Sequence, residues 1–196
     1  NIAGAMDIKT SEKQWRENEK VDKAMKNIKI LKGWEVDINP DGTIALEDKY
    51  LAKFDIVLAS IHSNFKMPKA DQTKRLVRAI ENPHIDIIAH PTGRVIHKRS
   101  GYELDMEEIF RSAARTKTIL EINCYPNRLD LNDQNIRRAI EHGVKLSLGT
   151  DSHSKNQLHY LDLGIAQARR GWAEKKDVVN CLGVEELLEF LKNKIF

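Results

Sequence analysis

The 196-residue sequence predicts an α/β protein built on a parallel sheet, either open and doubly wound or closed into a barrel. Short apolar runs alternate with longer amphipathic segments along the chain. Such runs are typical of parallel strands, which are buried on both faces, whereas half-exposed strands alternate apolar and polar residues. No linker or low-complexity tract interrupts this alternation, so we expect residues 1–196 to form a single domain.

The first predicted element, after a short loop, is a helix over residues 10–27 with Thr10 or Ser11 as its N-cap. A strand follows over residues 28–38 and ends at an Asn-Pro-Asp-Gly sequence that suits a tight turn. Four more strands are expected at residues 54–61, 85–89, 118–122 and 144–148. Helices with apolar residues at helical spacing are expected at residues 70–81, 105–116, 131–142, 156–169 and 184–193.

The composition argues against a membrane-spanning protein and against a disulfide scaffold. Charged residues make up 31% of the chain, and no segment approaches the roughly 20 apolar residues that a membrane span needs. The two cysteines, Cys124 and Cys181, lie far apart in the sequence, so we expect a cytoplasmic protein. A net charge of +3 is compatible with a polyanionic partner but is too small to indicate one.

Each predicted strand ends in side chains that bind metals or carry amides. In chain order these ends are Trp34-Glu35-Val36-Asp37, Ser60-Ile61-His62-Ser63, Ala89-His90-Pro91-Thr92-Gly93-Arg94, Glu121-Ile122-Asn123-Cys124 and Gly149-Thr150-Asp151-Ser152-His153. In both α/β architectures the carboxyl ends of the strands meet at one edge, where active sites form. We therefore expect these side chains to gather in one place.

The candidate metal ligands are Glu35, His62, His90, Asp151 and His153. A lone histidine at a strand end is more often a hydrogen-bonded rim residue, but three at successive strand ends favour a metal site. Asp151 and His153 would project to the same side of an extended backbone and form a chelating pair. Imidazole and carboxylate ligands suit Zn²⁺, Mn²⁺ or Fe²⁺.

Other polar residues are predicted to be ordinary. We interpret His84, His97, His142 and His159, and likewise Asp37, Asp86 and Glu121, as solvated surface residues, although Asp37 could orient a ligand histidine. Cys124 is expected to pack in the core. Core packing is also expected for Trp34 and Trp172.

Arginines near the strand ends suggest phosphate recognition. Arg94 follows His90, Arg128 follows the fourth strand, and Arg169 and Arg170 follow a helix. Guanidinium groups beside metal ligands suit phosphate oxygens. The alternative, about equally favoured for Arg94 or Arg128, is an ion pair with a nearby carboxylate such as Asp130.

Together these motifs resemble the PHP (polymerase and histidinol phosphatase) family. The residues that carry the resemblance are the strand ends above with Lys32-Gly33, Asn127-Arg128-Leu129-Asp130 and Ala168-Arg169-Arg170-Gly171-Trp172. They are most similar to the C-terminal PHP domain of bacterial and archaeal family X DNA polymerases. The resemblance covers nearly the whole chain.

The resemblance implies a distorted (β/α)7-type barrel with up to three divalent ions held by nine ligands. Glu35, His62, His90, Asp151 and His153 match family ligands. The family's opening His-x-His and Thr-Asp-His motifs have no counterpart, so we expect a barrel incomplete at its N-terminus and the C-terminal part of a longer polypeptide. We then expect fewer than three ions, one of them held by Glu35, His62 and His90.

The activity implied is Mn²⁺- or Zn²⁺-dependent phosphoester hydrolysis, as 3′-5′ exonuclease and 3′-end processing in DNA repair. The implied catalytic residues are Glu35, Asp151, Arg94 and Arg128, and the implied substrate contacts are Arg94, Arg128, Asn123 and Arg170. The implied partners are DNA and polymerase domains of the same polypeptide. Because ligands are missing, we expect weak or no activity from this chain alone. The alternatives are a small-molecule phosphatase of the histidinol-phosphate type and a non-catalytic structural domain.

Overall fold

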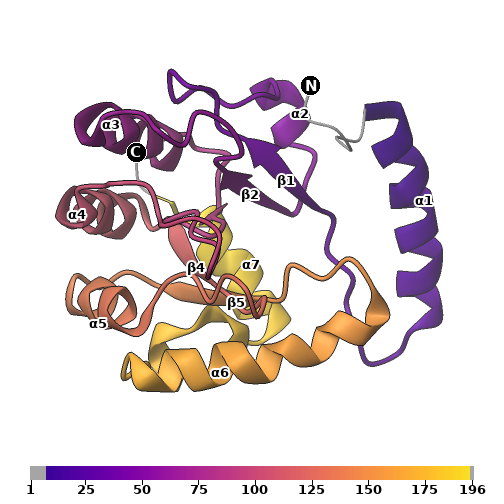
Figure 1. The fold of residues 1–196 in the computed structure, drawn as a ribbon. Coiled ribbons are helices and arrows are strands. Elements are labelled where there is room, and N and C mark those ends of the chain that lie inside the picture. Colours follow the sequence, from indigo (N-terminus) through magenta and orange to yellow (C-terminus); the bar gives the residue numbers. More distant parts are fainter. Residues whose placement is uncertain (1–7, 195–196) are drawn as a thin grey trace.

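The computed structural model describes residues 8–194 and contains a five-stranded parallel sheet (Figure 1). Its strands are β1 (Gly33–Asp37), β2 (Ile56–Ser60), β3 (Ile87–Ile88), β4 (Ile119–Asn123) and β5 (Leu146–Gly149), in the spatial order β1-β2-β3-β4-β5. A doubly wound sheet reverses its strand order at a switch point, whereas a barrel adds each strand beside the previous one. The α/β prediction is confirmed, and the strand order is that of a barrel.

Seven α-helices lie in the described part of the chain. They are α1 (Ile8–Ala24), α2 (Asp48–Leu51), α3 (Lys69–Ile80), α4 (Met106–Thr116), α5 (Asp133–Glu141), α6 (Leu161–Arg170) and α7 (Val184–Lys192). Three short 3₁₀ segments, η1 (Lys155–Tyr160), η2 (Lys175–Asp177) and η3 (Val179–Cys181), complete the fold. The loop expected before the first helix lies mostly outside the described residues.

Two predicted elements differ in extent. The first strand begins at Gly33 rather than at residue 28. The segment before Gly33 is bonded to α1 instead of to a strand, since the Ile30 amide donates to Oδ1 of Asp22 in α1 at 2.7 Å. The helix predicted over residues 156–169 begins as the 3₁₀ segment η1 and becomes α-helical only at Leu161.

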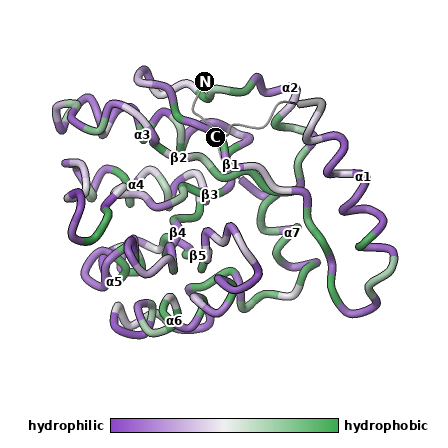
Figure 2. The backbone as a smooth tube through the Cα atoms, turned by 45° about the vertical axis from the view of Figure 1, so that its right-hand side comes forward, coloured by the Kyte–Doolittle hydropathy of each residue, from purple (hydrophilic) through white to green (hydrophobic). Residues whose placement is uncertain are grey.

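The strands are covered on both faces (Figure 2). Val57, Ala59 and Leu120 belong to the main core, which includes side chains of α3, α4 and α5. Ile87 and Ile119 belong to a second cluster with Val179 and Leu191, from η3 and α7. Because side chains alternate along a strand, α7 packs against the face opposite to α3, α4 and α5.

The face that α7 covers changes character toward the carboxyl ends of the strands. The register pairs Glu35 with Leu58 and Asp37 with Ser60, and Glu121 follows Ile119 by two residues on the same face. Apolar side chains therefore occupy one half of this face and polar side chains the other. This distribution places a polar site at the carboxyl edge of the sheet.

Three further expectations can be compared with the structure. No helix among residues 8–194 is long and apolar enough to cross a membrane. Cys124 and Cys181 are free, and Cys124 is buried. Trp34 packs edge-on against Phe54 beside the core, but Trp172 is 70% exposed, so its predicted core position is wrong. The Arg137 guanidinium covers the Trp172 ring at 4.3 Å.

Candidate metal centre

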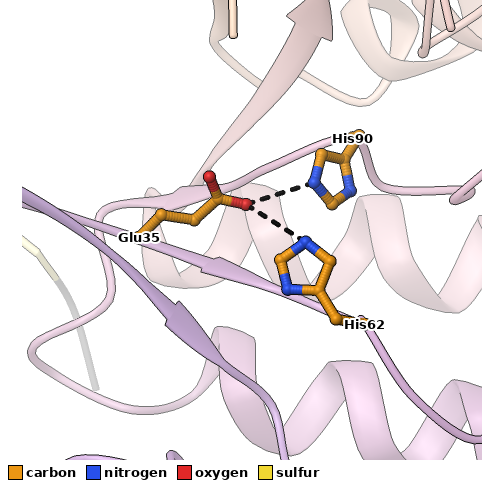
Figure 3. A group of neighbouring side chains, drawn as sticks. All are labelled: Glu35, His62 and His90. Carbon is orange, nitrogen blue, oxygen red and sulfur yellow. Dashed lines mark hydrogen bonds and ion pairs between the residues drawn. The ribbon is translucent and has the colours of Figure 1, made fainter. Parts of the chain in front are cut away.

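Glu35, His62 and His90 converge at the carboxyl edge of the sheet, with one ligand atom from each within 4.8 Å of the other two (Figure 3). Nε2 of His90 lies 3.1 Å from Glu35 Oε1, and Nε2 of His62 lies 3.6 Å from the same oxygen. Glu35 belongs to β1, while the histidines follow β2 and β3. Three adjacent strands thus supply one side chain each.

Asp37 fixes the orientation of His62. Its Oδ1 lies 2.7 Å from His62 Nδ1, and the two side chains are 29% and 34% exposed. A carboxylate at this distance accepts a hydrogen bond from Nδ1–H, which leaves Nε2 without a proton and free to bind a cation. The orienting role expected for Asp37 therefore agrees with the geometry, and the surface interpretation does not.

Buried carboxylates hold the loop of His90. His90 is 2% exposed with a positive φ of 32°, and its backbone amide donates to Glu121 Oε2 at 2.6 Å. Two residues later, Thr92 donates through its amide and hydroxyl to Asp130, at 3.0 and 2.9 Å. Glu121 is 3% exposed, so its predicted surface position is wrong. Asp130 is hydrogen bonded to Thr92 and is not paired with an arginine among the described residues. The alternative of an ion pair with a nearby carboxylate holds for Arg128, whose partner is Asp151.

A chain of polar contacts links this loop to the end of β5. Asn123 Nδ2 donates to Glu121 Oε2 at 3.1 Å and to Asp151 Oδ2 at 3.3 Å, and its Oδ1 accepts from the Tyr125 amide. Asn123 is fully buried, so the predicted substrate contact is corrected to a positioning role. Arg128 Nε lies 3.5 Å from Asp151 Oδ2, while Arg128 Nη1 is buried without a hydrogen-bond partner among the described residues.

Arg75 of α3 ties together the loops that follow β1 and β2. It is 1% exposed and donates to the backbone carbonyls of Ile38, Asn39 at 2.8 Å and Ser63 at 2.9 Å. These carbonyls lie next to Asp37 and His62 in the chain. Arg75 therefore holds the orienting carboxylate and its histidine in register, a role that its place within an amphipathic helix gave no reason to expect.

The electrostatic surroundings couple the three converging groups. Partial removal from water raises the pKa of Glu35, but hydrogen bonds from His90 and Ser60 and the charges of both histidines lower it to about 2. Burial is the largest influence on His90 and lowers its pKa, but the hydrogen bond to Glu35 and the charges of Glu121 and Glu35 together outweigh it, so the net pKa is raised. Burial raises the pKa of Glu121 to about 7. The Glu35 carboxylate is therefore ionised, and this negative charge beside two imidazoles attracts a cation.

The donor set fits a divalent cation. Two imidazole nitrogens aim at one carboxylate oxygen, so both can hydrogen bond to it only if both carry protons there. Asp37 favours the opposite tautomer of His62, with its proton on Nδ1. A cation between the three ligand atoms satisfies them all, and two imidazoles with a carboxylate suit Zn²⁺, Mn²⁺ or Fe²⁺.

The structure does not bring the other predicted site residues to these three ligands. Asp151 has a positive φ of 51° beyond the end of β5, so the extended backbone assumed for the chelating pair is wrong. His153 is 80% exposed, with Nδ1 3.9 Å from Asp151 Oδ1. Arg94 donates to the carbonyls of Arg128 and Leu129.

Arg170 is not part of this arrangement either. Its side chain is 70% exposed and donates to Asp133 Oδ2 at 2.9 Å on the first residue of α5. In the structure Arg170 forms a surface ion pair between two helices, and its contact with a substrate stays a prediction. An ion pair that is this exposed to water contributes little to stability.

Glu121 and Arg75 were missed by sequence reasoning. A signal existed for Glu121, which is the one charged residue within the apolar run of residues 118–122. Charged residues are almost never fully buried without a partner, so its presence there indicates a specific bond.

Known proteins resemble this chain over most of its length, although no family model matches it. It is 42% identical over 191 residues, 97% of the chain, to the DNA polymerase/3′-5′ exonuclease PolX of Bacillus subtilis (strain 168). That match covers 34% of the polymerase, so the chain spans about a third of its length. It is 29% identical to a probable phosphatase of Thermoanaerobacter sp. (strain X514), over 87% of the chain and 71% of that protein. A probable phosphatase of Syntrophotalea carbinolica is 31% identical over 80% of the chain and 62% of that protein.

Proposed function

We propose that this chain is a PHP-type, metal-dependent phosphoesterase domain whose metal is held by Glu35, His62 and His90. The convergence of these three ligand atoms within 4.8 Å carries the proposal. The similarity to a polymerase with exonuclease activity and to probable phosphatases supports a hydrolase that acts on phosphate esters. We further propose that the substrate is a DNA 3′ end, that the metal is Mn²⁺ or Zn²⁺, and that the protein works in cytoplasmic DNA repair.

The side chains around the centre have distinct roles in this proposal. Glu35, His62 and His90 would hold a divalent ion, which would supply a water of lowered pKa and a positive charge for a phosphoryl oxygen. Asp37 keeps His62 in the tautomer that presents Nε2, and Glu121 fixes the backbone of His90. Arg128, whose side chain is 19% exposed beside Asp151, is proposed to bind a phosphate oxygen.

Three residues from the sequence prediction keep a supporting role. Asp151 and His153 are proposed as ligands of a further ion, supported by the 3.9 Å between their side chains. Arg94 orders the loop of Arg128 through that loop's carbonyl oxygens, so we propose that it acts on phosphate mainly by positioning Arg128.

The alternative is hydrolysis of a small phosphate monoester, which the similarity to probable phosphatases favours. Turnover of histidinol phosphate and of a DNA strand with a 3′-phosphate discriminates between them. The DNA proposal requires the higher kcat/KM on DNA. A higher value on the small ester would assign the chain to the phosphatases.

The metal and the chemistry are tested together by Mn²⁺ binding and Mn²⁺-dependent hydrolysis of bis(p-nitrophenyl) phosphate. Glu35→Gln and His62→Ala should weaken both by at least about tenfold, because each removes one of three ligands. His159→Ala is the matched control, since His159 is exposed and outside the centre. Equal metal binding in all three variants would contradict the site. A protein that binds neither Mn²⁺ nor Zn²⁺ at saturating concentration is better explained as a structural domain.

A further inference from the structure

Two adjoining cavities lie beyond the histidines, on the loops that follow β2 and β3. One, of about 550 Å³, is lined by Phe65, Lys66 and Tyr102 among others, and the second, of about 450 Å³, is lined by residues 94–101. They share residues 99–101. Asn64 and Arg94, which line them, follow His62 and His90 by two and four residues, so the cavities open at the edge of the sheet that carries the metal centre.

The larger cavity has flat, apolar walls. The rings of Phe65 and Tyr102 are nearly parallel, with 9° between their planes and 6.2 Å between their centroids. The Arg99 guanidinium stacks on the Phe65 ring at 3.8 Å. Aromatic faces and planar guanidinium groups are the surfaces on which unpaired nucleic-acid bases stack.

The smaller cavity is cationic. Arg94, His97, Lys98 and Arg99 line it, Lys66 stands at the neighbouring cavity, and neither lining includes an aspartate or glutamate. Lys66, His97 and Lys98 are exposed. Such a lining favours the repeated negative charge of a phosphodiester backbone. A small phosphate ester at the metal centre would leave both cavities unused.

The loop that separates the cavities is held in shape by its own backbone. Val95 and Arg99 exchange two amide-to-carbonyl hydrogen bonds, at 2.9 and 2.8 Å, and the Ile96 amide donates to Asn127 O at 2.6 Å. The latter bond connects the loop with the segment that carries Arg128. A loop ordered before the ligand arrives loses less entropy on binding.

We propose that these cavities form a groove for single-stranded DNA, with a base against Phe65 in the larger cavity and backbone phosphates along the smaller one. The proposal rests on the phosphoesterase function above and extends it to the strand adjoining the reacting phosphate. The strand is single because the bases of a duplex are already stacked and cannot offer a face to Phe65.

The test measures fluorescence anisotropy of a labelled short oligothymidylate and of an abasic oligomer with the same phosphates, in EDTA so that the metal centre takes no part. Phe65→Leu keeps an apolar side chain but removes the stacking face, and should weaken oligothymidylate binding about tenfold while sparing the abasic oligomer. Lys98→Glu should weaken both oligomers. Phe54→Leu and Lys53→Glu are matched controls before β2, at the opposite edge of the sheet.

Equal weakening by Phe65→Leu and Phe54→Leu would overturn the base site, and equal weakening by Lys98→Glu and Lys53→Glu would overturn the phosphate site. Displacement of the oligonucleotide by polyglutamate at the same charge concentration would also overturn the proposal, because it would indicate a general anion surface. Hydrolysis of bis(p-nitrophenyl) phosphate should be unchanged in both groove variants. If the wild type lacks that hydrolysis while the binding pattern holds, the proposed phosphoesterase function fails and the groove stands.

Discussion

Replacing Asp37 should weaken metal binding although Asp37 is not one of the three ligands. Its Oδ1 lies 2.7 Å from His62 Nδ1, on the ring nitrogen opposite to the one that faces Glu35. Asp37→Ala frees the ring to rotate and to move its proton to Nε2. Asp37→Asn keeps an acceptor oxygen of the same shape but removes its charge.

The size of the effect follows from this geometry. Carboxylates that orient a ligand histidine contribute about 10- to 100-fold to metal affinity. About a third of each side chain is exposed, so water screens the pair and favours the lower end. We expect about a tenfold loss for Asp37→Ala, or about 1.4 kcal/mol. Charge-assisted hydrogen bonds are about twice as strong as neutral ones, so Asp37→Asn should lose about threefold.

Titration calorimetry with Mn²⁺ at pH 8 measures these affinities, and urea unfolding without metal shows whether the variants still fold. The reasoning requires the order wild type, Asp37→Asn, Asp37→Ala, His62→Ala from tightest to weakest. It is refuted if Asp37→Ala binds Mn²⁺ as tightly as the wild type while His62→Ala does not.

Three further predictions concern the supports of the centre. Mn²⁺ affinity should fall about tenfold or more from pH 8 to pH 6 by calorimetry, because the raised pKa of His90 lets protons compete above the ordinary histidine range, and an unchanged affinity would exclude a histidine ligand. Arg75→Met should cost about 3 kcal/mol in urea unfolding, since buried carbonyls lose their donor, and a loss below 1 kcal/mol would show that the loops hold themselves. Gly149→Ala should cost about 1 to 3 kcal/mol in urea unfolding and also weaken Mn²⁺ binding, because its Cβ would collide with Glu121 Oε1. Normal Mn²⁺ binding by this variant would show that Glu121 does not support the centre.

The sequence predicted the sheet well because buried parallel strands have a simple signature. The apolar runs at residues 118–122 and 144–148 correspond closely to β4 and β5. β3 is shorter than its apolar run, since only Ile87 and Ile88 pair with both neighbours. A local sequence pattern does not determine strand order, so periodicity alone could not distinguish an open, doubly wound sheet from a closed barrel.

The ligands were predictable where a side chain follows directly from a strand and less so beyond it. Glu35 lies within β1, and His62 and His90 each follow a strand by two residues, so the parallel sheet fixes the positions of all three. His153 lies in a loop whose backbone turns at Asp151, and a positive φ there cannot be inferred from residue spacing. Glu121 was overlooked because its importance comes from its hydrogen bond to the amide of His90, which lies in the loop after the neighbouring strand.

The most direct measurement is anomalous diffraction at the manganese edge from crystals grown with Mn²⁺. The account predicts a peak bonded to Glu35 Oε1 and to Nε2 of both His62 and His90, with His62 Nδ1 still on Asp37. An anomalous peak coordinated by other side chains would contradict the account. So would the absence, at saturating Mn²⁺, of any peak within coordination distance of Glu35, His62 and His90.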